Sequence, residues 1–125
     1  EIGVYPVTLT MQGLTDPHFS LFGETIETGH WHGDMPGLTD EAVVLATSQG
    51  CPRQIIRFSP KHYAFQAHLE FDPDAVELLI AADGEEKLRE QSEKLPFVQT
   101  PEELRGNDYS EMNAKLYAFL DSLVN

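Results

Sequence analysis

The chain has 125 residues, enough for one domain with a modest hydrophobic core. It carries 8 Lys and Arg against 21 Asp and Glu, and this net charge of −13 disfavours nucleic acids and anionic membranes as partners. No apolar run approaches the roughly 20 residues of a membrane helix, and the single cysteine cannot form an internal disulfide, so the expected location is the cytoplasm.

Strand patterns fill the first part of the chain. Residues 2–10 alternate and are β-branched, which predicts a strand, and Pro6 within it favours an edge position or a bulge. A loop with one short helical turn is expected over 13–23. The next strand is expected to run to the Gly33-Asp34 turn. A buried strand is predicted over 42–48, and 53–58 and 62–68 are predicted to form a hairpin.

Helix patterns fill the remainder. Asp72 followed by Pro73 predicts a helix start, an N-cap acceptor before a proline in the first turn. Residues 84–95 predict a charged surface helix, and 96–107 predict a loop. After Asp108, apolar side chains recur at helical spacing and predict a terminal helix packed on the sheet: Tyr109, Met112, Leu116, Phe119, Leu120 and Leu123. This order indicates an α+β domain, or half of a larger α/β domain.

Two residues near the end of the last predicted strand could work together in catalysis. His68 and Glu70 are two positions apart, so an extended backbone places both side chains on the same side. An imidazole oriented by a carboxylate is a candidate general base. Cys51 is the only cysteine, and it lies in a turn with no helix N-terminus to activate it, which makes it a poor candidate nucleophile.

A second polar group lies in the segment "HWHGD". His30 and His32 share a face of their strand, and with Asp34 they follow an H-x-H-x-D spacing. Two imidazoles and a carboxylate suit zinc or iron, and His68 or Glu70 could complete such a site. A metal-dependent hydrolase is therefore an alternative function.

The run "HWHGDMPGLTDEAVVLATSQGCPRQIIRFSPKHYAFQAHLEF" resembles the second half of class I glutamine amidotransferase domains, especially those similar to the GMP synthase amidotransferase subfamily. The pieces that carry the resemblance, in order, are His32-Gly33-Asp34, the strand 44–48, Cys51-Pro52, and "FQAHLE" over 65–70. The resemblance covers about residues 1–71, and the tail adds compatible helices.

The resemblance implies an α/β fold, the C-terminal half of a flavodoxin-like amidotransferase domain with a mixed sheet and C-terminal helices. Residues 1–125 would form part of one domain, with a strand-rich catalytic part over 1–71 and a helical tail over 72–125. Its partners would be glutamine, the missing N-terminal half and an ammonia acceptor of unknown identity. It implies no cofactor and no metal.

The resemblance also implies roles for particular residues. His68 would be the base of a Cys-His-Glu triad that hydrolyses the glutamine side-chain amide, and Glu70 would orient it. Trp31, His32, Gly33 and Asp34 would line the glutamine pocket. The G-x-C-x-G nucleophile turn of such domains is absent from this chain, so the chain alone is expected to be inactive. Ala67 and Leu69 depart from the usual "FHPE", which leaves a non-catalytic remnant as a further alternative.

Overall fold

The computed structural model describes residues 1–124, with the side chain of Ser20 left out. Its five-stranded sheet has the order β2-β1-β3-β4-β5. The strands are β1 (Ile2–Leu9), β2 (Thr25–Trp31), β3 (Val43–Thr47), β4 (Ile55–Ser59) and β5 (His62–Phe65). All neighbouring strands pair antiparallel, and one isolated parallel bridge joins Ile2 to Val98. The predicted strands and the β4–β5 hairpin are confirmed.

Pro6 lies where one side of β1 lacks a neighbouring strand. The Ile2 N–H, which points away from β2, donates to Phe97 O at 2.8 Å. The Pro6 nitrogen points to the same side, because backbone groups alternate along a strand. On that side β3 pairs with β1 only from Thr8 onward. The residue without an N–H therefore occupies an unpaired stretch, as its edge preference predicted.

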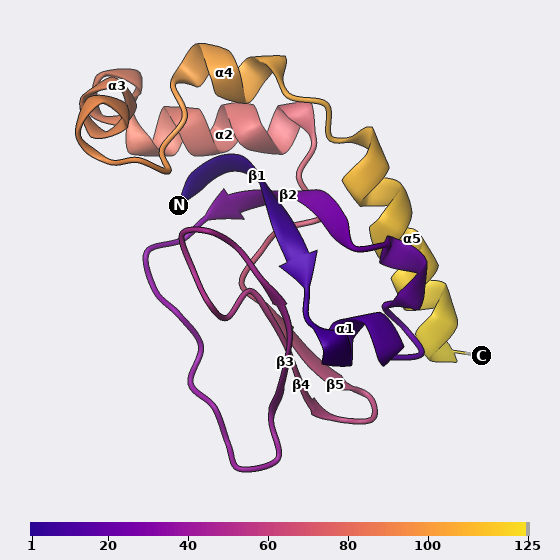
Figure 1. The fold of residues 1–125 in the computed structure, drawn as a ribbon. Helices are drawn as coiled ribbons and strands as arrows, with labels where there is room; N and C mark the ends of the chain where they lie inside the picture. The colour runs from indigo at the N-terminus through magenta and orange to yellow at the C-terminus, as the bar shows by residue number, and fades with distance from the viewer. Residues whose placement is uncertain (125) are drawn as a thin grey trace.

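The sheet curls so that the chain after β5 reaches β2. β5 ends at Phe65 rather than at His68, so the prediction of a strand over 62–68 was too long. His68 instead bridges to Gly29 on β2, with Gly29 N–H to His68 O at 2.8 Å and His68 N–H to Gly29 O at 2.7 Å. Figure 1 shows β3, β4 and β5 running side by side below β1 and β2. The curl brings His68 next to the strand that carries His30.

Helices cover two sides of this sheet. Short segments α1 (Met11–Thr15) and a 3₁₀ turn (Ser20–Phe22) lie between β1 and β2 in the chain. The tail contains α2 (Pro73–Asp83), α3 (Glu85–Lys94), α4 (Pro101–Gly106) and α5 (Ser110–Val124). In Figure 1, α2, α3 and α4 lie together above β1 and β2, and α5 runs down from α4 on the right, beside the sheet. Asp72 caps α2 as predicted, accepting the Ala75 N–H at 2.7 Å.

Helix α4 occupies part of the segment predicted as a loop, so that prediction was wrong for 101–106. Thr100 and Glu103 form a capping box, in which each side chain accepts the backbone N–H of the other. Pro101 follows in the first turn, where its missing N–H costs nothing. These local signals outweigh the short length of the helix.

The core joins the sheet to α5. Met112 and Phe119 on α5 are buried, and Phe119 packs against Phe19 with ring centroids 4.9 Å apart. Leu120 is 47 % exposed, so its assignment to the packed face was wrong. None of the helices in residues 1–124 is long and apolar enough to span a membrane.

Candidate active site

His68 and Glu70 form a hydrogen-bonded pair. His68 Nδ1 lies 2.6 Å from Glu70 Oε1, so Nδ1–H donates to the carboxylate and Nε2 remains available as an acceptor. The intervening residues point inward, because Ala67 and Leu69 are each 2 % exposed and belong to the core. The two departures from the usual motif therefore fill the interior, while the acid and the base face outward.

The position of His68 depends on Gly29. Phe71 stacks on the His68 ring, with centroids 4.6 Å apart and ring planes at 9°. A Cβ on Gly29 would lie 2.3 Å from Phe71 Cδ2 and 3.1 Å from His68 O. Only a residue without a side chain lets Phe71 and the His68 backbone approach β2 this closely.

Asn113 on α5 holds the backbone on both sides of Glu70. Its Nδ2 donates to Leu69 O at 2.6 Å and to Phe71 O at 3.0 Å. Sequence reasoning missed this residue, since an Asn on a helix carries no local signal of such a contact. The helical tail thus contributes directly to the geometry of the candidate site.

The segment after β2 lies beside this pair. Gln66 Nε2 donates to Asp34 O at 2.5 Å. Burial is the main cause that lowers the pKa of His32, and the charge of the nearby His68 lowers it further. His32, Gly33 and Asp34 line a cavity of about 510 Å³.

Trp31 lines a different cavity from Asp34. That second cavity, of about 380 Å³, is also lined by His32 and Gly33, and by Glu1, Ile2 and residues of the helical tail. The four predicted pocket residues are therefore divided between two cavities that share His32 and Gly33.

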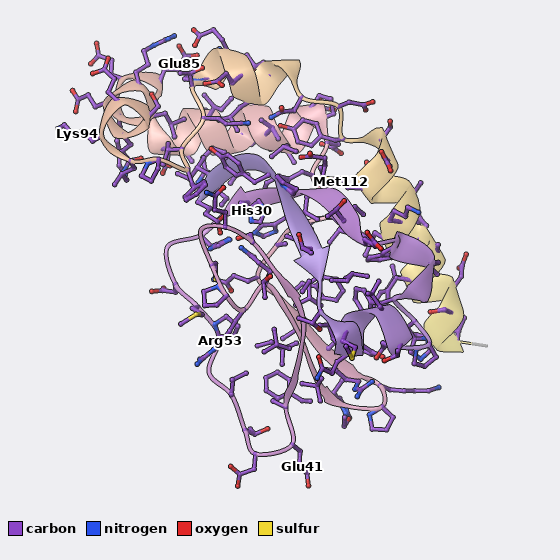
Figure 2. The ribbon with its side chains drawn as sticks, viewed as in Figure 1. His30, Glu41, Arg53, Glu85, Lys94 and Met112 are labelled. Atoms are coloured by element: carbon purple, nitrogen blue, oxygen red, sulfur yellow. The ribbon has the colours of Figure 1, made fainter. Side chains whose placement is uncertain are left out.

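A buried polar cluster lies behind the first cavity. His30 Nδ1 and His32 Nε2 are 3.1 Å apart, so the two rings do share a face. Burial lowers the pKa of His30 to about 4. Glu1, which sequence reasoning missed, places Oε1 3.5 Å from His32 Nε2 and accepts from Gln54 Nε2 at 2.6 Å. Figure 2 shows His30 on β2, near the centre of the molecule.

The structure brings together two of the ligands that the metal-hydrolase interpretation named, His30 and His32, and adds Glu1 to them. Among the described residues, the candidate ligand atoms of Glu1, His30 and His32 lie within 4.8 Å of one another. That group contains neither Asp34 nor His68.

Cys51 occupies the turn between β3 and β4 and is 6 % exposed. Its N–H donates to Ser48 Oγ at 3.1 Å, and its Sγ lies 3.8 Å from Arg53 O. Within residues 1–124 no hydrogen bond joins Cys51 to His68. Cys51 also lines the 510 Å³ cavity, opposite the segment that contains Gly33 and Asp34.

The chain was compared with protein-family models and with curated proteins. No protein-family model matches the chain. The glutamine amidotransferase-like protein YfeJ of Salmonella typhimurium is 49 % identical over 124 residues, 99 % of this chain and 51 % of that protein. The chain therefore spans about half the length of this curated relative.

Solved structures share the fold of this chain over about half of their own length. The crystal structure of SMU.1228c is 55 % identical, with a TM-score of 0.96, over 100 % of this chain and 53 % of that one. A glutamine amidotransferase from Thermotoga maritima (22 % identity, TM-score 0.78) shares the fold over 100 % of this chain and 51 % of that one. One from Methylobacillus flagellatus (21 % identity, TM-score 0.84) shares it over 99 % and 51 %. The predicted fold class is confirmed.

Proposed function

Because the chain is related to glutamine amidotransferase-like proteins over about half of their length, we propose that it is the C-terminal half of a class I glutamine amidotransferase domain. In this proposal the complete domain hydrolyses the side-chain amide of glutamine to glutamate and ammonia. The observation that carries it is the His68–Glu70 pair, 2.6 Å apart, beside the segment 32–34.

The proposed mechanism divides the triad between the two halves. A cysteine from the other half attacks the amide carbon, and His68 Nε2 takes the thiol proton and delivers it to the departing ammonia. Glu70 keeps the proton on Nδ1 and stabilises the imidazolium that forms. Water then hydrolyses the thioester, with His68 again acting as base, and releases glutamate. An acceptor of unknown identity takes the ammonia.

Segment 31–34 is proposed to bind glutamine. The cavity of about 510 Å³ is large enough for an amino acid, and Gly33 and Asp34 are exposed at its wall. Since Gln66 bonds to the Asp34 carbonyl, this wall is attached to the strand extension that carries His68. His68 and Glu70 themselves are not among the residues that line this cavity.

Glutamate release by the complete natural protein tests this function. His68→Ala should lower kcat by about 10²–10⁴-fold, the usual contribution of a general base. Glu70→Gln should lower kcat by less, because it leaves the imidazole in place. His62→Ala and Asp74→Asn are matched controls at exposed positions and should keep wild-type activity. Unchanged glutamate release by His68→Ala would refute the assignment.

A glutamine-analogue electrophile tests the division of the triad. It should label a cysteine outside residues 1–125 in the complete protein, and Cys51→Ala should leave labelling and activity intact. The 125-residue chain alone should release no glutamate, since it contains no nucleophile turn and no oxyanion donors from that turn. Labelling of Cys51 with loss of activity would contradict the proposal.

A further inference from the structure

A buried cluster lies behind the 510 Å³ cavity, and two of its three members, Glu1 and His30, have no role in the proposed hydrolysis. Its members are Glu1 before β1, and His30 and His32 at the end of β2. We propose that these three residues bind a divalent transition metal ion, Zn²⁺ by the nature of the donor set, as a structural site. Two imidazoles and one carboxylate are a common protein donor set for zinc.

The separations of the donor atoms fit such an ion. Ligands at about 2.0–2.1 Å from a tetrahedral zinc lie about 3.3 Å from one another. His30 Nδ1 is 3.1 Å from His32 Nε2, and Glu1 Oε1 lies 3.5 Å from His32 Nε2 and 3.9 Å from His30 Nδ1. Shifts of a few tenths of an ångström would close the site around the ion.

Both rings have outer partners of the kind that orient metal ligands. His30 Nε2 lies 3.2 Å from Tyr5 O and 3.0 Å from Thr28 Oγ1. The His32 ring lies within hydrogen-bonding reach of the Asp34 backbone. When the rings donate outward, two nitrogen lone pairs face each other at 3.1 Å. A cation between them removes that repulsion.

The Glu1 carboxylate has lone pairs that are free to bind a cation. The Glu1 side chain is 4 % exposed, and within residues 1–124 no Lys or Arg side chain forms a salt bridge with it. Its neutral donors are Gln54 Nε2, at 2.6 Å from Oε1, and the single hydroxyl of Ser48, at 2.9 Å from Oε2. These use about two of the four lone-pair sites of a carboxylate.

The location gives the ion access and a structural role. Glu1 and His32 both line the 510 Å³ cavity, so a water molecule from that side can serve as the fourth ligand. Glu1 also reaches Ser48, whose hydroxyl accepts the Cys51 N–H at 3.1 Å. The ion would therefore hold two walls of the cavity in place relative to each other. These walls are the segment after β2 and the turn at Cys51.

Zinc binding to the metal-stripped complete protein tests the proposal without reference to activity. Competition with a chromogenic chelator should give one ion per chain. Glu1→Gln and His32→Gln should each weaken binding by more than the ~10–100-fold typical of losing an outer-shell partner. Glu41→Gln and His62→Gln, at exposed positions, should bind as the wild type does. Thr28→Val should weaken binding about 10-fold.

Thermal unfolding and NMR keep the test decisive if a variant is unstable. Zinc should raise the Tm of the wild type and of both controls, but not that of Glu1→Gln. Zinc should also shift the nitrogen resonances of His30 Nδ1 and His32 Nε2. Absence of stoichiometric binding, or equal affinity in all variants, would overturn the site. So would a His30 Nδ1–H donated to His32 that persists in excess zinc, since this describes a metal-free hydrogen-bond network.

Discussion

Replacement of Gly29 by alanine should disturb the candidate active site from the opposite strand. The added methyl group would lie 2.3 Å from Phe71 Cδ2 and 2.9 Å from Phe71 Cε2, where contacts of 3.4–4 Å are ordinary. The Phe71 ring must therefore move by about 1 Å or more. Because His68 stacks on that ring, the base moves with it.

The size of the effect follows from the packing. Phe71 is 6 % exposed, so it has no free space to enter. Overpacking in such a site costs typically about 1–3 kcal/mol. With an m-value of about 2 kcal/mol per M, the urea midpoint should fall by about 0.5–1.5 M. A displacement of about 1 Å at a catalytic group can lower kcat by about 10²-fold.

Urea unfolding and glutamate release by the complete protein measure the two effects. Gly37→Ala is a matched control, since its Cβ meets nothing within 4 Å, and it should change stability by less than about 0.5 kcal/mol. Phe71→Leu makes room for the methyl group, so combining it with Gly29→Ala should give a coupling energy of about 0.5–3 kcal/mol. Wild-type stability and wild-type kcat in Gly29→Ala would refute this account of how His68 is positioned.

Two further residues give independent predictions. Asn113→Ala removes both hydrogen bonds to the Leu69 and Phe71 carbonyls and should lower the free energy of unfolding in urea by about 1–3 kcal/mol. It should also lower kcat, because Glu70 shifts. Glu111→Ala, at an exposed position of the same helix, should change neither quantity. Burial, together with the Asp16 carboxylate, raises the pKa of Tyr63 to about 12, so between pH 10 and 12 the unfolded chain loses this proton first and stability falls as pH rises. Tyr63→Phe should make that fall shallower while Tyr117→Phe, 69 % exposed, leaves it unchanged; equal slopes in all three proteins would contradict the assignment.

Local patterns in the sequence predicted most of the elements correctly. Alternation and, for the strand over 42–48, an apolar run predicted all five strands, and the Asp72-Pro73 signal located the start of α2. The errors occurred where contacts between residues far apart in the chain decide where an element ends or which side chain is buried. β5 ends at Phe65 because His68 leaves the hairpin and pairs with Gly29, which lies 39 residues earlier in the chain. Leu120 follows the helical spacing but is 47 % exposed, while Leu116 and Leu123 on either side of it along α5 pack against the core.

The sequence by itself determined the contacts between residues close in the chain. An extended backbone places His68 beside Glu70, and His30 beside His32, whatever surrounds them, because side chains two residues apart share a side. Only the tertiary structure placed Glu1 against the two histidines, Gly29 under Phe71, and Asn113 on the carbonyls next to Glu70. Those contacts depend on how the sheet curls and where α5 packs, and neither is encoded in the periodicity of any one segment.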